Sequence, residues 1–185
     1  MTTIFVAGSM HIKRLDGQFV ERLQSIAASK SILAVGDANG ADAAIQQVLS
    51  DAGAKAVTIY CTGGQPRNNV GNWPVHVVQS GAKAGTREYF TAKDVKMAEI
   101  ADSGFMVWDT KSTGTLSNVI ELVKRNKQCV VYVNKDKVFM TIFDIEDLER
   151  LISRMSDSAR EAAEDKISLS HLLANIAHKQ YAVQV

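Results

Sequence analysis

Short apolar runs alternate with longer amphipathic stretches along most of the chain. Runs such as Thr3–Ala7, Ser31–Val35 and Ala56–Cys61 are almost entirely apolar and end at glycine or polar residues. Runs of this length that contain β-branched residues predict buried strands. Further strands are predicted at Val75–Gln79, Gly104–Trp108, Cys129–Val133 and, after an Asn-Lys-Asp-Lys turn, Val138–Ile142.

Apolar residues at helical spacing predict helices between these strands. The first helix is expected to begin at Asp16, whose carboxylate is suited to cap free backbone N–H groups. Gly53 is expected to end the second helix and Asp144 to cap the helix after the last strand. The predicted helices span residues 16–29, 39–53, 86–102, 115–126 and 144–155.

Strands that are apolar throughout, and that alternate with helices, indicate a parallel sheet covered on both faces. We therefore predict an α/β fold: a Rossmann-like three-layer sandwich with a mostly parallel central sheet over residues 1–155. From Ser156 the chain becomes polar and helix-prone, which predicts a C-terminal helical extension over residues 156–185. This extension is expected to pack on the core or on a second subunit, so a homo-oligomer is expected.

The charge balance argues against polyanionic partners. The 185 residues include 21 basic and 20 acidic side chains, a formal net charge of +1. No global field would hold such a chain on nucleic acid or on an anionic membrane, so neither partner is expected. The N-terminal apolar stretch is too short for a signal peptide, and no window approaches the roughly 20 apolar residues of a membrane span. We expect a cytoplasmic protein.

Cysteine and histidine usage gives no sign of a metal site. Cys61 and Cys129 each lie inside an apolar run, which is typical of small buried residues in a reducing compartment. The sequence has no C-x-x-C, no H-E-x-x-H and no His/Cys cluster. We therefore expect no metal and no bound cofactor.

Glycine and small polar residues follow several of the predicted strands. In parallel α/β sheets, ligands bind outside the carboxyl ends of the strands, where the strand order changes. Gly40 and Gly114 also stand at helix starts, where free N–H groups and the helix dipole attract anions. The turns concerned contain Gly8, Ser9 and Met10; Gly36, Asp37, Gly40 and Asp42; and Asp109, Ser112, Gly114 and Thr115.

Each of these features also has a purely structural interpretation. The segment from Asp109 to Ser117 is either a helix cap or a turn that contacts phosphate or sugar oxygens, and the two roles are compatible. Arg67, in a long polar loop, is either a solvated side chain or a phosphate clamp. Trp73, from the same loop, is either a loop anchor or a base-stacking residue.

The glycine-rich turns do not match the common nucleotide fingerprints. No G-x-G-x-x-G follows the first strand and no G-x-x-x-x-G-K-[ST] occurs, so classical NAD dehydrogenases and P-loop NTPases are poor fits. The segments "FVAGSM", "AVGDANGADAAIQQVL" and "KDVKMAEIADSGFMVWDTKSTGTLSNVIELV" resemble the SMF/DprA–LOG (SLOG) superfamily. The similarity covers about residues 4–133 and is nearest to the YspA/YpsA-like branch and to the nucleoside 2-deoxyribosyltransferase-like proteins.

This resemblance implies a Rossmann-like domain that binds nucleotides, nucleosides or their derivatives. In several branches it also implies cleavage or transfer at the N-glycosidic bond. Gly8 and Ser9 would lie against the sugar or phosphate, and Asp94 matches an acidic residue in a family helix. The resemblance further implies a second loop shaped by Gly36, Asp37, Gly40 and Asp42, and a phosphate- or sugar-facing turn formed by Asp109, Ser112, Gly114 and Thr115.

One departure from the family pattern concerns catalysis. Catalytic branches carry glutamate four residues after the glycine, where this chain has Asn118. A carboxamide is neither a nucleophile nor a general base, but it can hydrogen-bond ribose hydroxyls. We therefore expect a sensor or binding module for a nucleotide or nucleoside derivative. The alternatives are an N-glycosidase or deoxyribosyltransferase whose carboxylate is Asp94, Asp109 or Glu121, and a scaffold whose turns are only caps.

Overall fold

Seven strands form one sheet in the computed structural model, which describes residues 1–182 apart from the side chain of Tyr181. The strands are β1 (Thr3–Gly8), β2 (Ile32–Gly36), β3 (Val57–Thr62), β4 (Val75–Val78), β5 (Ser103–Trp108), β6 (Cys129–Val133) and β7 (Val138–Ile142). Their order is β4-β3-β2-β1-β5-β6-β7. All neighbouring pairs are parallel except β6 and β7, which are antiparallel, so the prediction of a mostly parallel sheet is confirmed.

The helices follow the predicted pattern, and their ends are capped as the sequence suggested. Asp16 accepts a hydrogen bond from the Gln18 N–H at 3.0 Å, and Asp144 accepts one from the Asp147 N–H at 2.8 Å. The helices are α1 (Gly17–Ala27), α2 (Ala41–Asp51), α3 (Arg87–Ile100), α4 (Thr113–Val123), α5 (Ile145–Ile152), α6 (Asp157–Ile167) and α7 (Leu169–Ala182).

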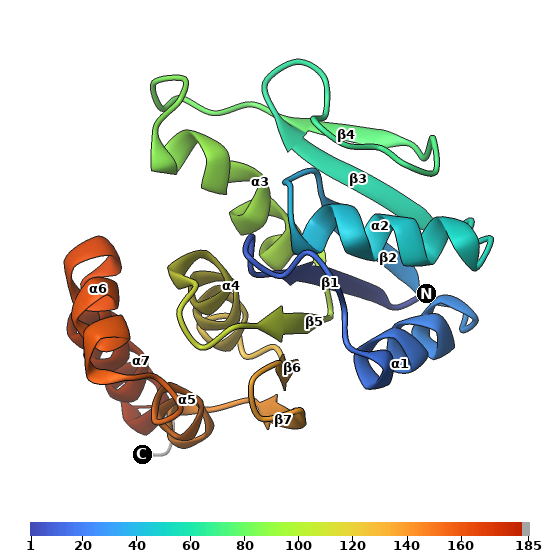
Figure 1. Cartoon of the computed structure of the whole chain (residues 1–185). Helices are drawn as coiled ribbons and strands as arrows, with labels where there is room; N and C mark the ends of the chain where they lie inside the picture. Colours follow the sequence, from blue (N-terminus) through green and yellow to red (C-terminus); the bar gives the residue numbers. More distant parts are fainter. Residues whose placement is uncertain (183–185) are drawn as a thin grey trace.

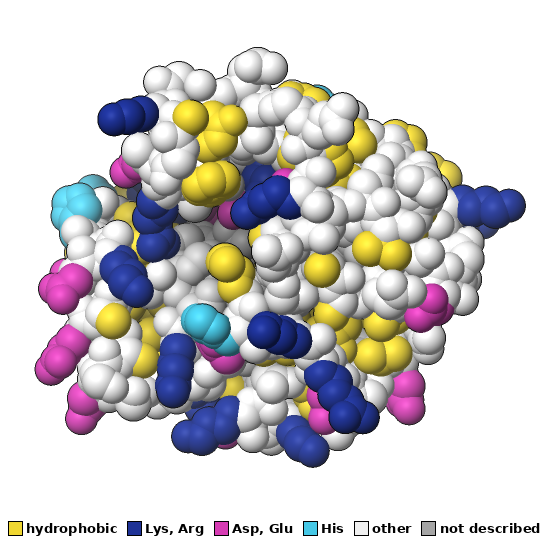
Figure 2. All heavy atoms as spheres, turned by 45° about the horizontal axis from the view of Figure 1, so that its top comes forward, with side chains coloured by type: hydrophobic (Ala, Val, Ile, Leu, Met, Phe, Trp, Pro, Cys, Tyr) yellow, Lys and Arg dark blue, Asp and Glu magenta, His cyan; other side chains and the backbone are white. Residues whose placement is uncertain are grey.

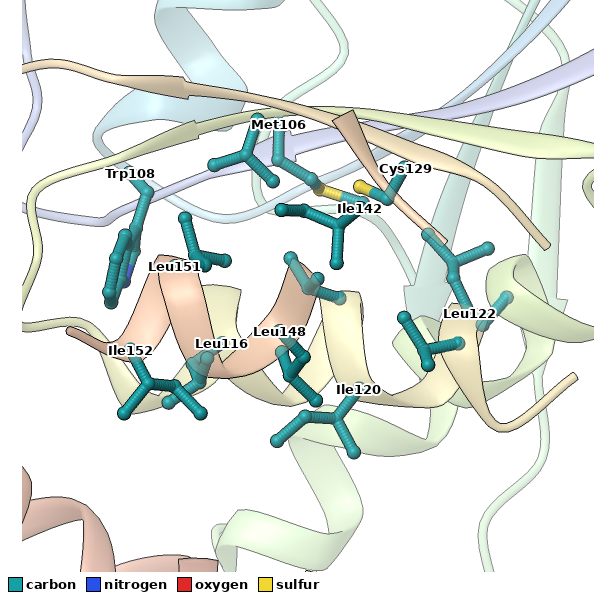
Figure 3. Close-up of a cluster of buried hydrophobic side chains, with 14 of the residues drawn as sticks. Met106, Trp108, Leu116, Ile120, Leu122, Cys129, Ile142, Leu148, Leu151 and Ile152 are labelled. Carbon is teal, nitrogen blue, oxygen red and sulfur yellow. The ribbon is translucent and has the colours of Figure 1, made fainter. Parts of the chain in front are cut away.

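Two apolar layers hold the helices on the sheet. Along β5, Phe105 and Val107 pack toward α1 and α2, whereas Met106 and Trp108 pack toward α4 and α5. Figure 3 shows the second layer, where Leu148 and Leu151 of α5 meet side chains of the sheet and of α4. This arrangement confirms an α/β sandwich with helices on both faces of the sheet (Figure 1).

The C-terminal extension continues the second layer. Ala159 and Ala163 of α6, and Leu169 and Ile176 of α7, are buried in the same apolar cluster as α4 and α5. In Figure 1, α6 and α7 lie beside α4 and α5, far from β3 and β4. The extension therefore packs on the core of its own chain.

Strand β1 lies at the point where the strand order reverses. Val6 pairs with Val35 of β2 on one side and with Phe105 of β5 on the other. The chain first builds the sheet outward from β1 through β2, β3 and β4, and then crosses to the other side of β1 with β5. Helices on the two sides of such a switch diverge, which opens a crevice at the carboxyl ends of β1 and β5.

Candidate functional site

A cleft of about 790 Å³ opens at the carboxyl ends of β1 and β5. Ala7 and Gly8 of β1 contribute to its lining, together with residues of α3, of the start of α4 and of α6. In Figure 2 this face of the molecule is hollowed, and dark-blue Lys and Arg side chains gather around the hollow. The cleft lies where the predicted turns were expected to converge.

The start of α4 is organised by its own side chains. The Ser112 hydroxyl accepts a hydrogen bond from the Thr115 N–H at 3.3 Å, so Ser112 is the helix cap. The Asp109 carboxylate accepts bonds from the N–H groups of Lys111 and Ser112 at 3.0 and 2.7 Å. No hydrogen bond within the described part of the chain uses the N–H of Thr113 or Gly114, so these donors are available to an anion.

Gly114 lines the cleft, although no structural requirement for glycine exists at this position. An added Cβ would meet only the Ser112 hydroxyl, at 3.8 Å, and the backbone is not in the left-handed region. Asn118, one turn further along α4, also lines the cleft and is 8% exposed. Its carboxamide makes no hydrogen bond to any residue that the structure describes. The start of α4 thus combines open space, free N–H donors and an unpaired amide.

Ser9 lies behind this turn and holds it against β1. Its buried hydroxyl donates to the Asp109 carboxylate at 3.1 Å, accepts from the Asp109 N–H at 3.1 Å, and lies 3.2 Å from the Thr115 hydroxyl. Ser9 is 0% exposed. Its role in this structure is to position the turn, because the hydroxyl already has protein partners.

The two glycines of the second loop are required by close approaches. Gly40 has a φ of 78°, and an added Cβ would lie 2.0 Å from the carbonyl oxygen of Met10. At Gly36, an added Cβ would lie 2.3 Å from a carboxylate oxygen of Asp42 and 2.7 Å from the Lys93 ammonium nitrogen. Gly40 therefore allows the close approach of the Met10 backbone, and Gly36 allows the buried Asp42–Lys93 pair to pack against its own backbone.

Lys93 is the centre of a buried cluster of charges. Its ammonium group donates to Asp94 at 2.8 Å, and lies 3.8 Å from Asp37 and 3.9 Å from Asp42. Arg67 binds the Asp37 carboxylate in a bidentate arrangement, with Nε and Nη2 donating hydrogen bonds at 3.1 and 2.9 Å. Three carboxylates therefore share two cations, and the cluster is neutral only when one carboxylate carries a proton.

The pKa values reflect this imbalance. Burial raises the pKa of Asp42 to about 6, because Lys93 offsets only part of the cost of burying its charge. Burial acts in the same direction on Asp37, but its hydrogen bonds from Arg67 outweigh it and hold the pKa of Asp37 below the usual range. Burial disfavours the charge of Lys93, yet Asp94, Asp42 and Asp37 together raise its pKa.

The structure brings most of the predicted site residues together. Those that line the cleft are Gly8, Met10, Asp42, Asp94, Ser112, Gly114, Thr115 and Asn118. Others support the lining from behind, namely Ser9, Gly36, Asp37, Gly40 and Asp109. Glu121 lies outside the lining and forms ion pairs with Lys124, at 2.9 Å, and with Arg125. Of the three candidate catalytic carboxylates, only Asp94 therefore borders the cleft.

Several residues of the cleft were not anticipated from the sequence. They are Arg87, Phe90, Thr91 and Lys93 of α3, and Ser158, Ala159, Ala162 and Lys166 of α6. A lysine four residues before the buried Met97 was a detectable signal, because that spacing places Lys93 on the apolar face of α3. The α6 residues had no signal, since only the tertiary fold brings this helix to the cleft.

The long loop between β3 and β4 is anchored rather than free. Trp73 is buried, and its indole N–H donates to the carbonyl of Ala54 at 2.8 Å, so it is the loop anchor. Arg67 lines the cleft, but its guanidinium is engaged by Asp37. Cys61 and Cys129 are buried free thiols, as expected from their apolar surroundings.

Comparison with protein-family models, curated proteins and solved structures finds no match to the chain. Within residues 1–182, no helix has both the length and the apolar character that crossing a bilayer requires. The His, Cys, Asp and Glu side chains of the described residues form no group of three or more positioned to hold a metal ion.

Proposed function

We propose that the cleft binds a nucleotide or nucleoside derivative and that the protein acts as a sensor or binding module for it. The observation that carries this proposal is the start of α4, where Gly114 leaves space beside two unused N–H donors. A helix N-terminus with free N–H groups stabilises a phosphate through hydrogen bonds and the helix dipole.

Cations around the cleft support an anionic ligand. Arg87 donates to the hydroxyls of Thr113, at 3.2 Å, and Ser117, at 3.4 Å, and so stands over the first turn of α4. Lys111 and Lys166 also line the cleft and are exposed. Within the described residues none of these three forms an ion pair with a carboxylate, which leaves their charge available to phosphate.

Polar groups deeper in the cleft suit a sugar. The Asn118 carboxamide offers both a donor and an acceptor, and the Asp94 carboxylate, 19% exposed, offers acceptors. Ribose hydroxyls need both kinds of partner. A ligand that joins a phosphate to a sugar therefore matches the chemistry of this lining better than phosphate alone.

Thermal unfolding with a panel of nucleoside mono-, di- and triphosphates tests the proposal. A ligand at 100 times its Kd adds about 2.7 kcal/mol to stability, which raises Tm by about 5–10 °C for a chain of this size. Gly114→Ala is expected to fold normally and to lose this increase, because its methyl group occupies the anion position. Gly17→Ala is the matched control, since Gly17 also begins a helix and has no atom within 4 Å of an added Cβ.

The outcomes are distinct. No increase in Tm with any nucleotide at millimolar concentration would favour a scaffold whose turns are only caps. An equal increase for the wild type and Gly114→Ala would mean that the ligand lies elsewhere.

A second candidate function is cleavage or transfer at the N-glycosidic bond. It is favoured by the position of Asp94, a carboxylate that borders the cleft beside the buried Lys93. In hydrolysis, water would add to the anomeric carbon and the base would leave with a proton, so a carboxylate in this position is the natural general base. Chromatography of free base released from nucleoside monophosphates tests this function. Asp94→Asn must abolish release, whereas Glu121→Gln, outside the cleft, must not.

A further inference from the structure

One face of α3 is turned toward the cleft. Arg87, Phe90, Thr91 and Asp94 all line it, and their spacing of three, four and seven residues places them on a single helical face. Along this face a cation, an aromatic ring, a hydroxyl and a carboxylate follow in order. None of the first three was assigned a role by the sequence.

Phe90 is an aromatic side chain that is held in place yet remains open to solvent. It is 41% exposed and belongs to neither of the two buried apolar clusters. The Arg67 guanidinium lies 5.3 Å from the centre of its ring, and the Tyr89 ring meets it edge-on at 5.4 Å. Arg67 is itself held by its two hydrogen bonds to the Asp37 carboxylate. Arg67 and Tyr89 therefore orient the ring, and part of its surface borders the cleft.

We propose that Phe90, oriented by Arg67, forms a stacking platform for the planar base of the ligand, separate from the anion position at the start of α4. This inference rests on the proposed nucleotide-binding function and adds the location of the base. Every nucleobase has an apolar π-face, and stacking on an aromatic side chain needs no hydrogen-bonding group. The platform accordingly tolerates different bases and favours the larger purines.

Arg87 links the platform to the anion position. Phe90 is one turn along α3 from Arg87, so the two side chains start about 5–6 Å apart. Arg87 in turn contacts the Thr113 hydroxyl beside Gly114. The platform and the anion position therefore lie on adjoining walls of the same cleft, with Arg87 between them. Phosphate at α4 and base at Phe90 leave the sugar between them, near Asn118 and Asp94.

Binding affinities of Phe90 variants for three probes test the platform. The probes are adenosine 5′-monophosphate, cytidine 5′-monophosphate and ribose 5-phosphate, the last of which has no base. Phe90→Leu is expected to weaken the binding of adenosine 5′-monophosphate at least about fivefold, because the stacking contact with the base is lost. The affinity for ribose 5-phosphate is expected to stay unchanged. Phe90→Trp is expected to restore or strengthen nucleotide binding. Val95→Ala is the matched control, because Val95 is also 41% exposed on α3 but does not line the cleft.

Each result decides the matter. Unchanged nucleotide affinity in Phe90→Leu, or equal weakening of the nucleotide and of ribose 5-phosphate, overturns the platform while the proposed function stands. Where ribose 5-phosphate binds too weakly to measure, the order of nucleotide affinity for Trp, Phe and Leu at position 90 decides, and equal affinities overturn the platform. Failure of the wild type to bind any of the three probes overturns the proposed function itself, and the platform with it.

Discussion

The buried carboxylate of Asp42 is expected to make stability depend on pH in an unusual direction. Folding raises its pKa from 3.8 to about 6, chiefly through burial. Between these two values the folded chain binds more protons at this site than the unfolded chain, so the stability contributed here falls as pH rises. A tenfold change in an acid constant is about 1.4 kcal/mol, so the ionised Asp42 lowers stability above pH 6 by about 3 kcal/mol.

Asp42→Asn removes the titration while keeping the side-chain shape. Lys93 still has Asp94 at 2.8 Å and Asp37 at 3.8 Å, so the substitution does not leave the buried ammonium group without a carboxylate partner. The free energy of unfolding of the variant, relative to the wild type, is expected to rise by about 2 kcal/mol between pH 4.5 and 7.5.

Urea unfolding followed by circular dichroism at four pH values across this range measures the difference. The comparison between the two proteins cancels carboxylates outside the cluster that titrate in the opposite sense, such as Glu121, where hydrogen bonds from Lys124 and Arg125 outweigh burial and lower the pKa. Asp51→Asn, an exposed residue at the end of α2, is the control. A difference between Asp42→Asn and the wild type that stays constant with pH, or falls as pH rises, would refute the reasoning.

Four further substitutions probe the close approaches, the capping and the core packing of the fold. Gly40→Ala is expected to cost about 3 kcal/mol or more in chemical denaturation, because its Cβ would meet a backbone carbonyl at 2.0 Å. Gly53→Ala, also at positive φ but with open space, is expected to cost only about 1 kcal/mol, and equal losses would contradict the role of the close approach. Ser112→Ala removes the cap of α4 and is expected to cost about 1 kcal/mol by the same measurement; no loss would show that the cap does not stabilise the helix. Leu148→Ala, in the fully buried core, is expected to lower the free energy of unfolding by about 2–5 kcal/mol, and a loss below about 1 kcal/mol would contradict this packing.

Local sequence signals account for the elements and their ends. The caps at Asp16 and Asp144 and the left-handed Gly53 after α2 were predictable because each depends on residues within one helical turn. The apolar strands predicted a sheet covered on both faces, and that in turn predicted which loops share an edge. Asp42 and Gly114 were therefore placed at the cleft without any knowledge of long-range contacts, whereas Asn118 became a candidate only through the family resemblance.

The environment of the long loop between β3 and β4 depended on residues far apart in the chain. Whether Arg67 and Trp73 were solvated, anchored or ligand-facing had no local answer, since their partners Asp37 and Ala54 are distant in sequence.

The sequence alone determined the type and order of the elements, because hydrophobic periodicity and capping act over a few residues. Only the tertiary structure decided that Lys93 is buried among three carboxylates, that Phe90 faces the cleft and that α6 supplies one of its walls. The physical reason is that burial and charge pairing depend on which elements become neighbours. A helical pattern gives the spacing of residues on a face, but not what that face meets.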